Sequence, residues 1–101
     1  MMRRVFEWDP AKDAANKSKH GVSFETAKLV FDDPLSTTKQ DRIEDGEMRW
    51  QTVGLVGRHR VLLVAHAIFE RIDDGGEVEV FRLISARKAT WHEREAYEDG
   101  R

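Results

Sequence analysis

The sequence predicts an α+β fold: an antiparallel β-sheet of about four strands, with two N-terminal helices and one C-terminal helix packed on it. Helix-start signals stand near both ends of the chain, at Asp9-Pro10 and at Thr90. Between them, β-branched and apolar runs alternate with glycine-containing turns, which is typical of consecutive hairpins. A chain of 101 residues is long enough for one hydrophobic core, so we expect one domain over residues 1–101.

The first third of the chain is expected to form a short strand and a helix. The strand covers residues 3–8 and ends before Asp9, which can cap a helix over residues 10–20. Pro10 suits the first helical turn, and Gly21 ends the helix because glycine readily adopts the left-handed conformation. The helix is expected to present a narrow apolar stripe made of Ala11, Ala14 and Ala15.

A second helix and a polar segment follow. The helix is expected to start at Ser23, continue to Phe31 and stop before Pro34, whose ring disfavours helical geometry in the preceding residue. Residues 35–48 are polar and acid-rich, so we expect a solvated loop with room for a short strand at 35–39. An alternative role for this segment is to steer a basic partner.

The second half of the chain predicts strands and a closing helix. Strands are expected over residues 50–56, 61–69 and 78–84, joined by hairpin turns at 57–60 and 73–76. The closing helix is expected over residues 91–98, since Thr90 and Glu93 form a T-x-x-E capping box.

Composition restricts the possible functions. Lys plus Arg number 17 and Asp plus Glu 19, so nucleic-acid binding would require local clustering of cations. The chain has no cysteine, which excludes disulfides and thiolate zinc sites. No segment approaches the ~20 apolar residues of a membrane span, and the first ten residues lack a signal-peptide core, so we expect a cytoplasmic protein. The four histidines lack metal-ligand spacing, so no metal site or other cofactor is expected.

Arginines near the end of the last predicted strand are the most informative candidates. Arg82 and Arg87 flank Ser85 on a rigid element, where planar guanidinium groups can meet a phosphate through two hydrogen bonds. Arg82 is expected either to pair with a carboxylate such as Glu79 or Glu93 or to await a phosphate. The alternative is that these cations are ordinary solvated charges at a sheet edge.

Metal-independent RNA cleavage needs a base for the 2′-hydroxyl, cations for the phosphorane and a donor for the leaving oxygen. The chain offers candidates for each role. The candidate catalytic residues are Arg87, Arg82, His20, His66 and Glu93. The candidate RNA-binding residues are Lys19, Ser85, Lys88, Arg94 and Tyr97. His66, on a central strand, fits a hydrogen-bonded structural histidine as well as a catalyst.

Two segments resemble a known family. The patterns W-D-x-x-K-x-x-x-N-x-x-K-H-G-V-x-F, from Trp8, and R-x-I-S-A-R-x-A, from Arg82, are similar to those of the BrnT family of type II toxins. The resemblance implies a RelE-like fold and a ribonuclease that cleaves cellular RNA without metal. It also implies a hetero-oligomer with a cognate BrnA antitoxin, whose ribbon-helix-helix domain contacts operator DNA. The motif positions it marks are Lys19, His20, Arg82, Arg87, Glu93 and Arg94.

Two functional hypotheses therefore arise from the sequence. In the first, the chain is an endoribonuclease toxin inhibited by a BrnA-like antitoxin. In the second, it is a noncatalytic antitoxin-binding module that acts mainly as a corepressor in a DNA-binding complex. The two differ in whether Arg87 stabilises a scissile phosphate or grips an acidic segment of the partner.

Overall fold

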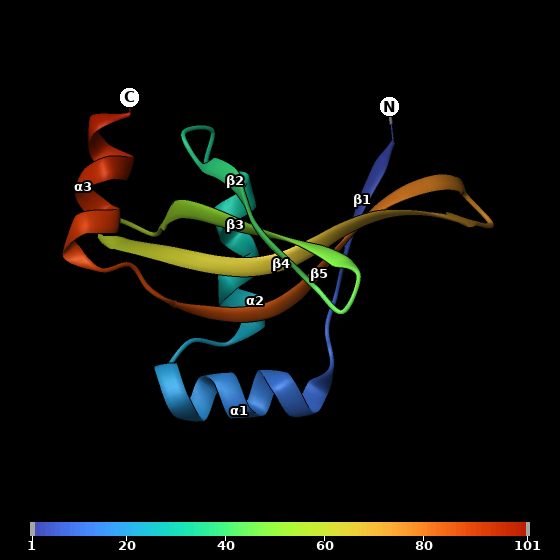
Figure 1. Ribbon diagram of the computed structural model, residues 1–101, viewed down its shortest axis with the longest axis horizontal. Helices are drawn as coiled ribbons and strands as arrows, with labels where there is room; N and C mark the ends of the chain where they lie inside the picture. Colours follow the sequence, from blue (N-terminus) through green and yellow to red (C-terminus); the bar gives the residue numbers. More distant parts are fainter. Residues whose placement is uncertain (1, 101) are drawn as a thin grey trace.

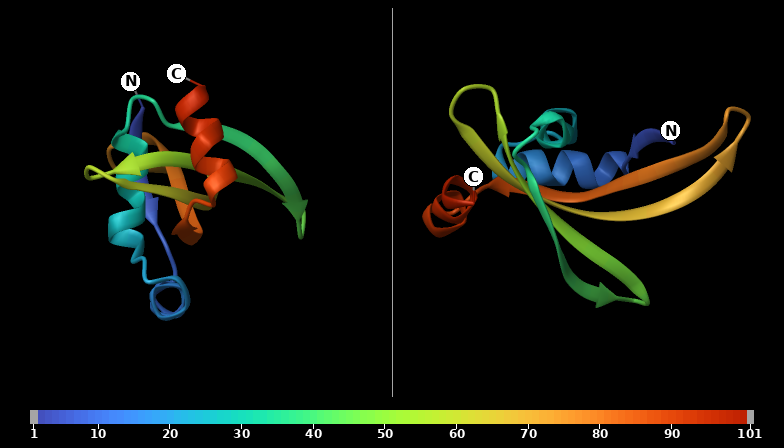
Figure 2. Two further views of the ribbon diagram at one scale, coloured as in Figure 1. Left: turned by 90° about the vertical axis from the view of Figure 1, so that its left-hand side faces the viewer. Right: turned by 90° about the horizontal axis from the view of Figure 1, so that it is seen from above.

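The computed structural model describes residues 2–100 and shows a curved five-stranded sheet with helices on one face and at one end (Figures 1 and 2). The strand order is β1-β5-β4-β3-β2. The elements in chain order are β1 (Arg3–Glu7), α1 (Pro10–His20), α2 (Phe24–Ala27), the 3-10 helix η1 (Lys28–Asp32), β2 (Thr37–Glu44), β3 (Glu47–Val56), β4 (Arg60–Asp73), β5 (Gly76–Lys88) and α3 (Trp91–Asp99).

The predicted α+β class is confirmed, whereas the predicted sheet is only partly right. Strands β2 to β5 are antiparallel, but β1 joins the edge of the sheet parallel to β5, with Val5 opposite Val80. The sheet is therefore mixed and has five strands. The apolar residues of β1 indicate a strand, but side-chain composition does not define the direction in which a strand pairs.

The acid-rich segment forms a hairpin, and its prediction as a loop is wrong. Strands β2 and β3 are joined by Asp45 and Gly46, whose φ angles are 52° and 78°. Positive φ at both central residues is the requirement of a type I′ turn, which Asp-Gly favours. The charges are tolerated because β2 is an edge strand and every residue in it is exposed.

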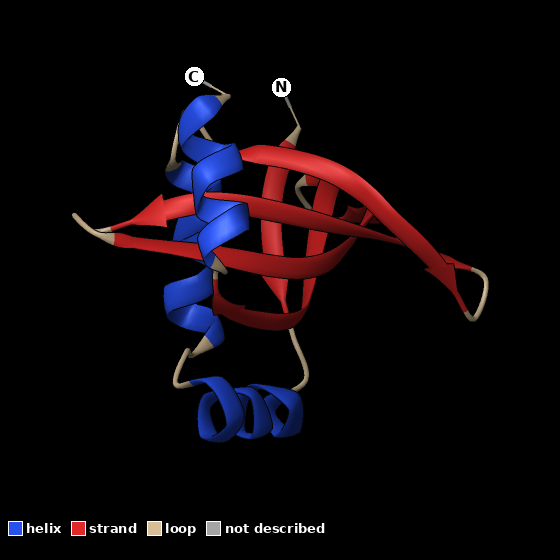
Figure 3. Cartoon of the chain, turned by 60° about the vertical axis from the view of Figure 1, so that its left-hand side comes forward, coloured by secondary structure: helices blue, strands red, loops and turns tan. Residues whose placement is uncertain are grey.

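The predicted second helix divides into two short pieces. Helix α2 covers four residues, and the chain then tightens into η1, which packs on β3. Gly54 permits this contact, since a Cβ at that position would lie 2.9 Å from the carbonyl oxygen of Val30. In Figure 3 these helical pieces stand against the sheet and α1 lies beyond its edge.

Helix α1 is attached by a buried amide, and its predicted alanine stripe is wrong. Asp9 caps the helix and Gly21 ends it at φ 73°, as expected, but the three alanines are exposed. Asn16 is buried instead. Its Nδ2 donates to the carbonyl oxygens of Val22 and Ala86 at 2.9 and 2.8 Å, and its Oδ1 accepts from Ala86 N at 3.0 Å. Two of these hydrogen bonds join α1 to β5, and the third holds the turn that follows α1.

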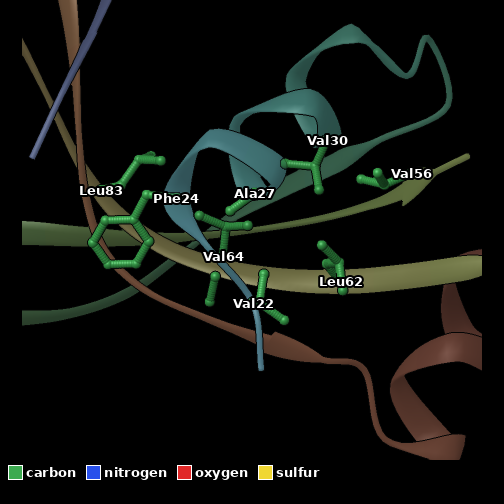
Figure 4. Close-up of a cluster of buried hydrophobic side chains, with 9 residues drawn as sticks. Val22, Phe24, Ala27, Val30, Val56, Leu62, Val64 and Leu83 are labelled. Carbon is green, nitrogen blue, oxygen red and sulfur yellow. The ribbon is translucent and has the colours of Figure 1, made fainter. Parts of the chain in front are cut away.

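The main hydrophobic core lies between α2, η1 and one face of the sheet (Figure 4). Its fully buried members include Phe24, Val30, Leu62 and Val64. A neighbouring aromatic group surrounds His66, with Phe31 and Phe81 centroids 5.0 and 5.6 Å from its ring. Within residues 2–100, the structure contains no helix with the length and apolar character needed to cross a membrane.

Candidate nucleic-acid interface

A β-bulge in β5 places Arg82 and Arg87 on the same side of the sheet. The two residues are five positions apart, and strict alternation would direct their side chains to opposite faces. The pairing of β4 with β5 shifts between Ala65 and His66, so that Arg82 lies opposite Ala67 and Arg87 lies opposite Leu63. Because Leu63 and Ala67 share a face of β4, the two arginines also share it.

We call this surface the arginine face. It is the side of the sheet opposite α2 and η1, and it is defined by Leu63, Ala65, Ala67, Arg82, Ser85 and Arg87. Leu63 and Ala67, which lie opposite the two arginines, are four positions apart on β4, which corresponds to about 13 Å along the strand. This spacing suits two points along a nucleic-acid backbone better than one shared phosphate.

Arg87 forms a bidentate ion pair with Glu93 of α3. Its Nη1 and Nη2 donate to the two carboxylate oxygens of Glu93 at 2.7 and 2.9 Å, and Nη1 also donates to the carbonyl oxygen of Lys88 at 3.2 Å. The ion pair, assisted by the backbone N–H of Thr90, lowers the pKa of Glu93 to about 2. Glu93 is therefore an anion at neutral pH and a weak base, so its geometry suits positioning Arg87 better than exchanging protons.

Arg82 is paired with a carboxylate, as expected, but with Glu47 and not with either of the two named from the sequence. Its guanidinium donates to Glu47 of β3 and lies 5.8 Å from the centre of the Phe69 ring. Arg49 Nε reaches the same carboxylate at 3.1 Å. The predicted partners, Glu79 and Glu93, are wrong for Arg82, because β5 directs its side chain across β4 toward β3.

A cleft of about 360 Å³ separates α3 from the arginine face. Tyr97 lines it with its ring, is 5% exposed, and donates its hydroxyl hydrogen to Asp33. The lining residues are Thr37, Lys39, Gln51, Val53, Leu63, His92, Glu93, Ala96 and Tyr97. Arg87, through Glu93, stands at the border of this cleft.

Lys19 and His20 lie around a different hollow. Together with Ser85 they border a shallow cleft of about 290 Å³ between α1 and β5, beyond the point where β1 ends its pairing at Arg82. Ser85 thus connects this cleft to the arginine face. Among residues 2–100, no three acidic or histidine side chains gather closely enough to hold a metal ion.

Three further predicted site residues also lie away from the arginine face. His66 points toward the core, is 0% exposed, and bonds Thr52 through Nε2 at 2.8 Å; burial lowers its pKa to about 4. Lys88 lies opposite Leu62, whose side chain is in the core on the other face. Arg94 donates to the His59 carbonyl oxygen at 2.8 Å. This geometry fits the structural alternative for His66 better than proton exchange with a substrate, because its ring is enclosed.

Strands β2 and β3 contribute site residues that were not predicted from the sequence. Glu47 fixes Arg82, while Lys39 and Gln51 face each other across these strands and line the cleft. Asp45-Gly46 was the available signal, because this dipeptide predicts a hairpin and would have placed both flanking segments in the sheet. No comparable signal marks the bulge in β5.

Comparisons with known proteins agree with this architecture. The fold is that of a small ribonuclease toxin: the crystal structure of the Brucella abortus ribonuclease toxin, BrnT, superposes with a TM-score of 0.57 and 24% identity, covering 88% of this chain and 99% of that one. No match was found among curated proteins. The family model described as ribonuclease toxin, BrnT, of type II toxin-antitoxin system matches residues 8–93. The chain belongs to the BrnT family.

The ion pair on α3 predicts a measurable titration. In a carbon-detected NMR titration, Glu93 should show a pKa of about 2, and Arg87→Ala should raise it toward the usual 4.5, because the cation that favours the ionised form is lost. Since the folded-state pKa is lowered, the stabilisation is present above about pH 4.5 and is lost as the pH falls toward 2. Arg58→Ala, an exposed arginine in the β3–β4 turn, is the control. An unchanged Glu93 titration in Arg87→Ala would contradict the assignment.

Proposed function

We propose that the chain is a metal-independent endoribonuclease whose arginine face binds the RNA backbone. The observation that carries this proposal is the bulge in β5, which directs Arg82 and Arg87 to the same side of the sheet, where no helix of the N-terminal half covers them. Membership in a family of ribonuclease toxins supports it. Fixed guanidinium groups can neutralise the charge that develops on a phosphorane, and this is the role for which a metal ion would otherwise be needed.

Arg87 is the better placed of the two arginines to contact the scissile phosphate. Its guanidinium group is oriented by Glu93. A cation that is already oriented need not reorganise when negative charge develops on the phosphate in the transition state. Arg82, about 13 Å away along the strand, would hold a neighbouring part of the backbone. Both guanidinium groups already pair with carboxylates, so RNA phosphates must bind beside Glu47 and Glu93 or displace them. Binding should therefore weaken as salt rises.

Proton transfer is assigned to an exposed imidazole. His20 borders Ser85 at the edge of the arginine face, and His92 borders Glu93 in the cleft. Both are exposed. An exposed imidazole can reach a 2′-hydroxyl or a leaving oxygen and exchange a proton with it, whereas His66 is enclosed.

We further propose that a BrnA-like antitoxin inhibits the enzyme in the cytoplasm and supplies the operator-DNA contacts of the complex. Membership in a type II toxin-antitoxin family supports an antitoxin partner. The tip of the β2–β3 hairpin carries Asp41, Glu44 and Asp45, all exposed, and offers a negative surface to a basic partner segment.

Removal of either arginine should impair RNA cleavage, but in different ways. Arg87→Ala should lower the cleavage rate of a defined RNA by about 100-fold or more, because it removes a preorganised donor from the charged transition state. Arg82→Ala should mainly weaken RNA binding, because it removes a contact with the neighbouring backbone. Arg58→Ala should retain the normal rate, and EDTA should leave cleavage by the unmodified protein unchanged. Thermal unfolding identifies any loss of fold.

Specific outcomes would contradict these assignments. Full activity in Arg87→Ala would remove this residue from the mechanism, and loss of cleavage in EDTA would contradict metal independence. An unmodified protein that leaves RNA intact while binding its antitoxin would favour the noncatalytic corepressor.

Charge at the hairpin tip should affect the rate of antitoxin binding. The triple substitution Asp41→Asn, Glu44→Gln and Asp45→Asn should slow association at low salt about tenfold, because it removes long-range attraction for a basic segment, and the effect should shrink as salt screens the charges. Stopped-flow mixing with the antitoxin measures this rate. An association rate that is unaltered at low salt would show that the hairpin tip does not steer docking.

A further inference from the structure

The cleft between α3 and the arginine face has the chemical character of a site for a flat heterocycle. Its floor is apolar, formed by Val53 and Leu63 on the sheet and Ala96 on α3, while polar groups surround the floor. Its volume of about 360 Å³ lies in the range of about 300–1,000 Å³ usual for small-ligand sites. The exposed imidazole of His92 stands on the helical wall and offers a stacking plane.

Gln51 is the polar group of this cleft that is best placed to recognise a ligand. It is half-buried, and within residues 2–100 its side-chain amide makes no hydrogen bond. Glu93 and Tyr97 are already paired, since Glu93 is held by Arg87 and Thr90, and Tyr97 donates to Asp33. Among residues 2–100, the side chains of Thr37, Lys39 and His92 also make no hydrogen bond, but they are exposed, whereas Gln51 is half-buried. A side-chain amide that is left half-buried and unpaired gains hydrogen bonds when a complementary ligand enters.

Cations flank Gln51 on the same face of the sheet. Lys39 lies directly opposite it on β2, and Ala65 and then Ser85 continue the same row across β4 and β5. The adjacent row runs from Thr37 through Val53 and Leu63 to Arg87. Neighbouring strands are about 4.8 Å apart, so a ligand that reaches from Arg87 to Gln51 crosses the sheet by roughly 10 Å. A nucleotide whose phosphate lies on Arg87 spans such a distance.

We infer that this cleft holds one nucleobase of the RNA next to the cleaved linkage, and that Gln51 reads the edge of that base. The inference rests on the proposed function. A side-chain amide donates one hydrogen bond and accepts another, so it can read a base edge on which a donor stands beside an acceptor. Adenine and cytosine present an amino group beside a ring nitrogen, and uracil and guanine present an N–H group beside a carbonyl oxygen. The placement of the base against Gln51 selects one of these edges, so Gln51 is a specificity-determining residue and the protein should cleave preferentially beside one base.

Sequencing of cleavage ends tests this inference. Incubation of the protein with a random-sequence RNA pool should reveal a preference for one base at one position near the cut. Gln51→Ala should reduce that preference about fivefold or more while cleavage continues, because a two-bond base contact discriminates by about 1–3 kcal/mol. Gln51→Glu keeps the size but removes the amide donor and should also reduce it. Gln40→Ala is the matched control, since Gln40 is an exposed glutamine opposite Trp50, on the other face of the sheet.

The outcomes separate this inference from the proposed function. An unchanged base preference in Gln51→Ala, with normal cleavage, would overturn the inference and leave the ribonuclease assignment intact. Absence of cleavage by the unmodified protein would overturn the proposed function. An effect of Gln51→Ala on antitoxin affinity alone, with the cleavage pattern unaltered, would assign the cleft to the protein partner and likewise overturn the inference.

A second measurement does not depend on the variants folding. Titration of the unmodified protein with adenosine, cytidine, guanosine and uridine monophosphates should shift the NMR signals of Val53, Leu63 and Ala96. The shifts should be largest with the monophosphate of the base that the cleavage sites favour. Equal shifts with all four nucleotides, or shifts elsewhere, would contradict base reading in this cleft.

Discussion

One extra residue in β5 determines which surface of this molecule can bind a phosphate backbone. Without the bulge near Ile84, five positions between Arg82 and Arg87 would place one guanidinium in the core and the other outside. The bulge keeps Leu83 and Ala86 in the core, three positions apart, and returns both arginines to the opposite face. The same β-bulge therefore keeps the core packed and places both arginines on one surface.

The carboxylates that pair with the two arginines have two opposing effects: they orient the guanidinium groups, and they reduce the attraction of this face for phosphate. Glu93 and Glu47 hold the two arginines in defined positions, which lowers the reorganisation needed when a phosphate arrives. The same pairing cancels charge and makes RNA compete for the guanidinium groups. Because Glu93 also caps α3 through the Thr90 N–H, the position of this helix and the orientation of Arg87 are coupled. A partner that moves α3 would therefore also change the orientation of the Arg87 guanidinium.

The local elements were predictable because their signals are local. Asp9, Gly21 and the Thr90–Glu93 capping box end or begin helices through contacts within a few residues, and each was confirmed. The burial of Asn16 and the parallel direction of β1 depend on partners distant in the sequence, at Ala86 and Val80. The same applies to the candidate site. Arg82 and Arg87 were selected from the chain, but their shared face depends on a pairing shift, and Gln51 lies on a strand whose neighbour was taken for a loop.

Contact between the arginine face and RNA is the central claim, and NMR of a complex tests it directly. An oligonucleotide methylated at its 2′-oxygens binds without cleavage and can be mixed with isotopically labelled protein. Intermolecular NOEs should connect RNA protons to the methyl groups of Ala65 on β4 and Ala96 on α3, both of which are accessible beside Arg87. NOEs to the exposed methyl groups of Ala14 and Ala15 on α1, with none to Ala65 or Ala96, would contradict the account.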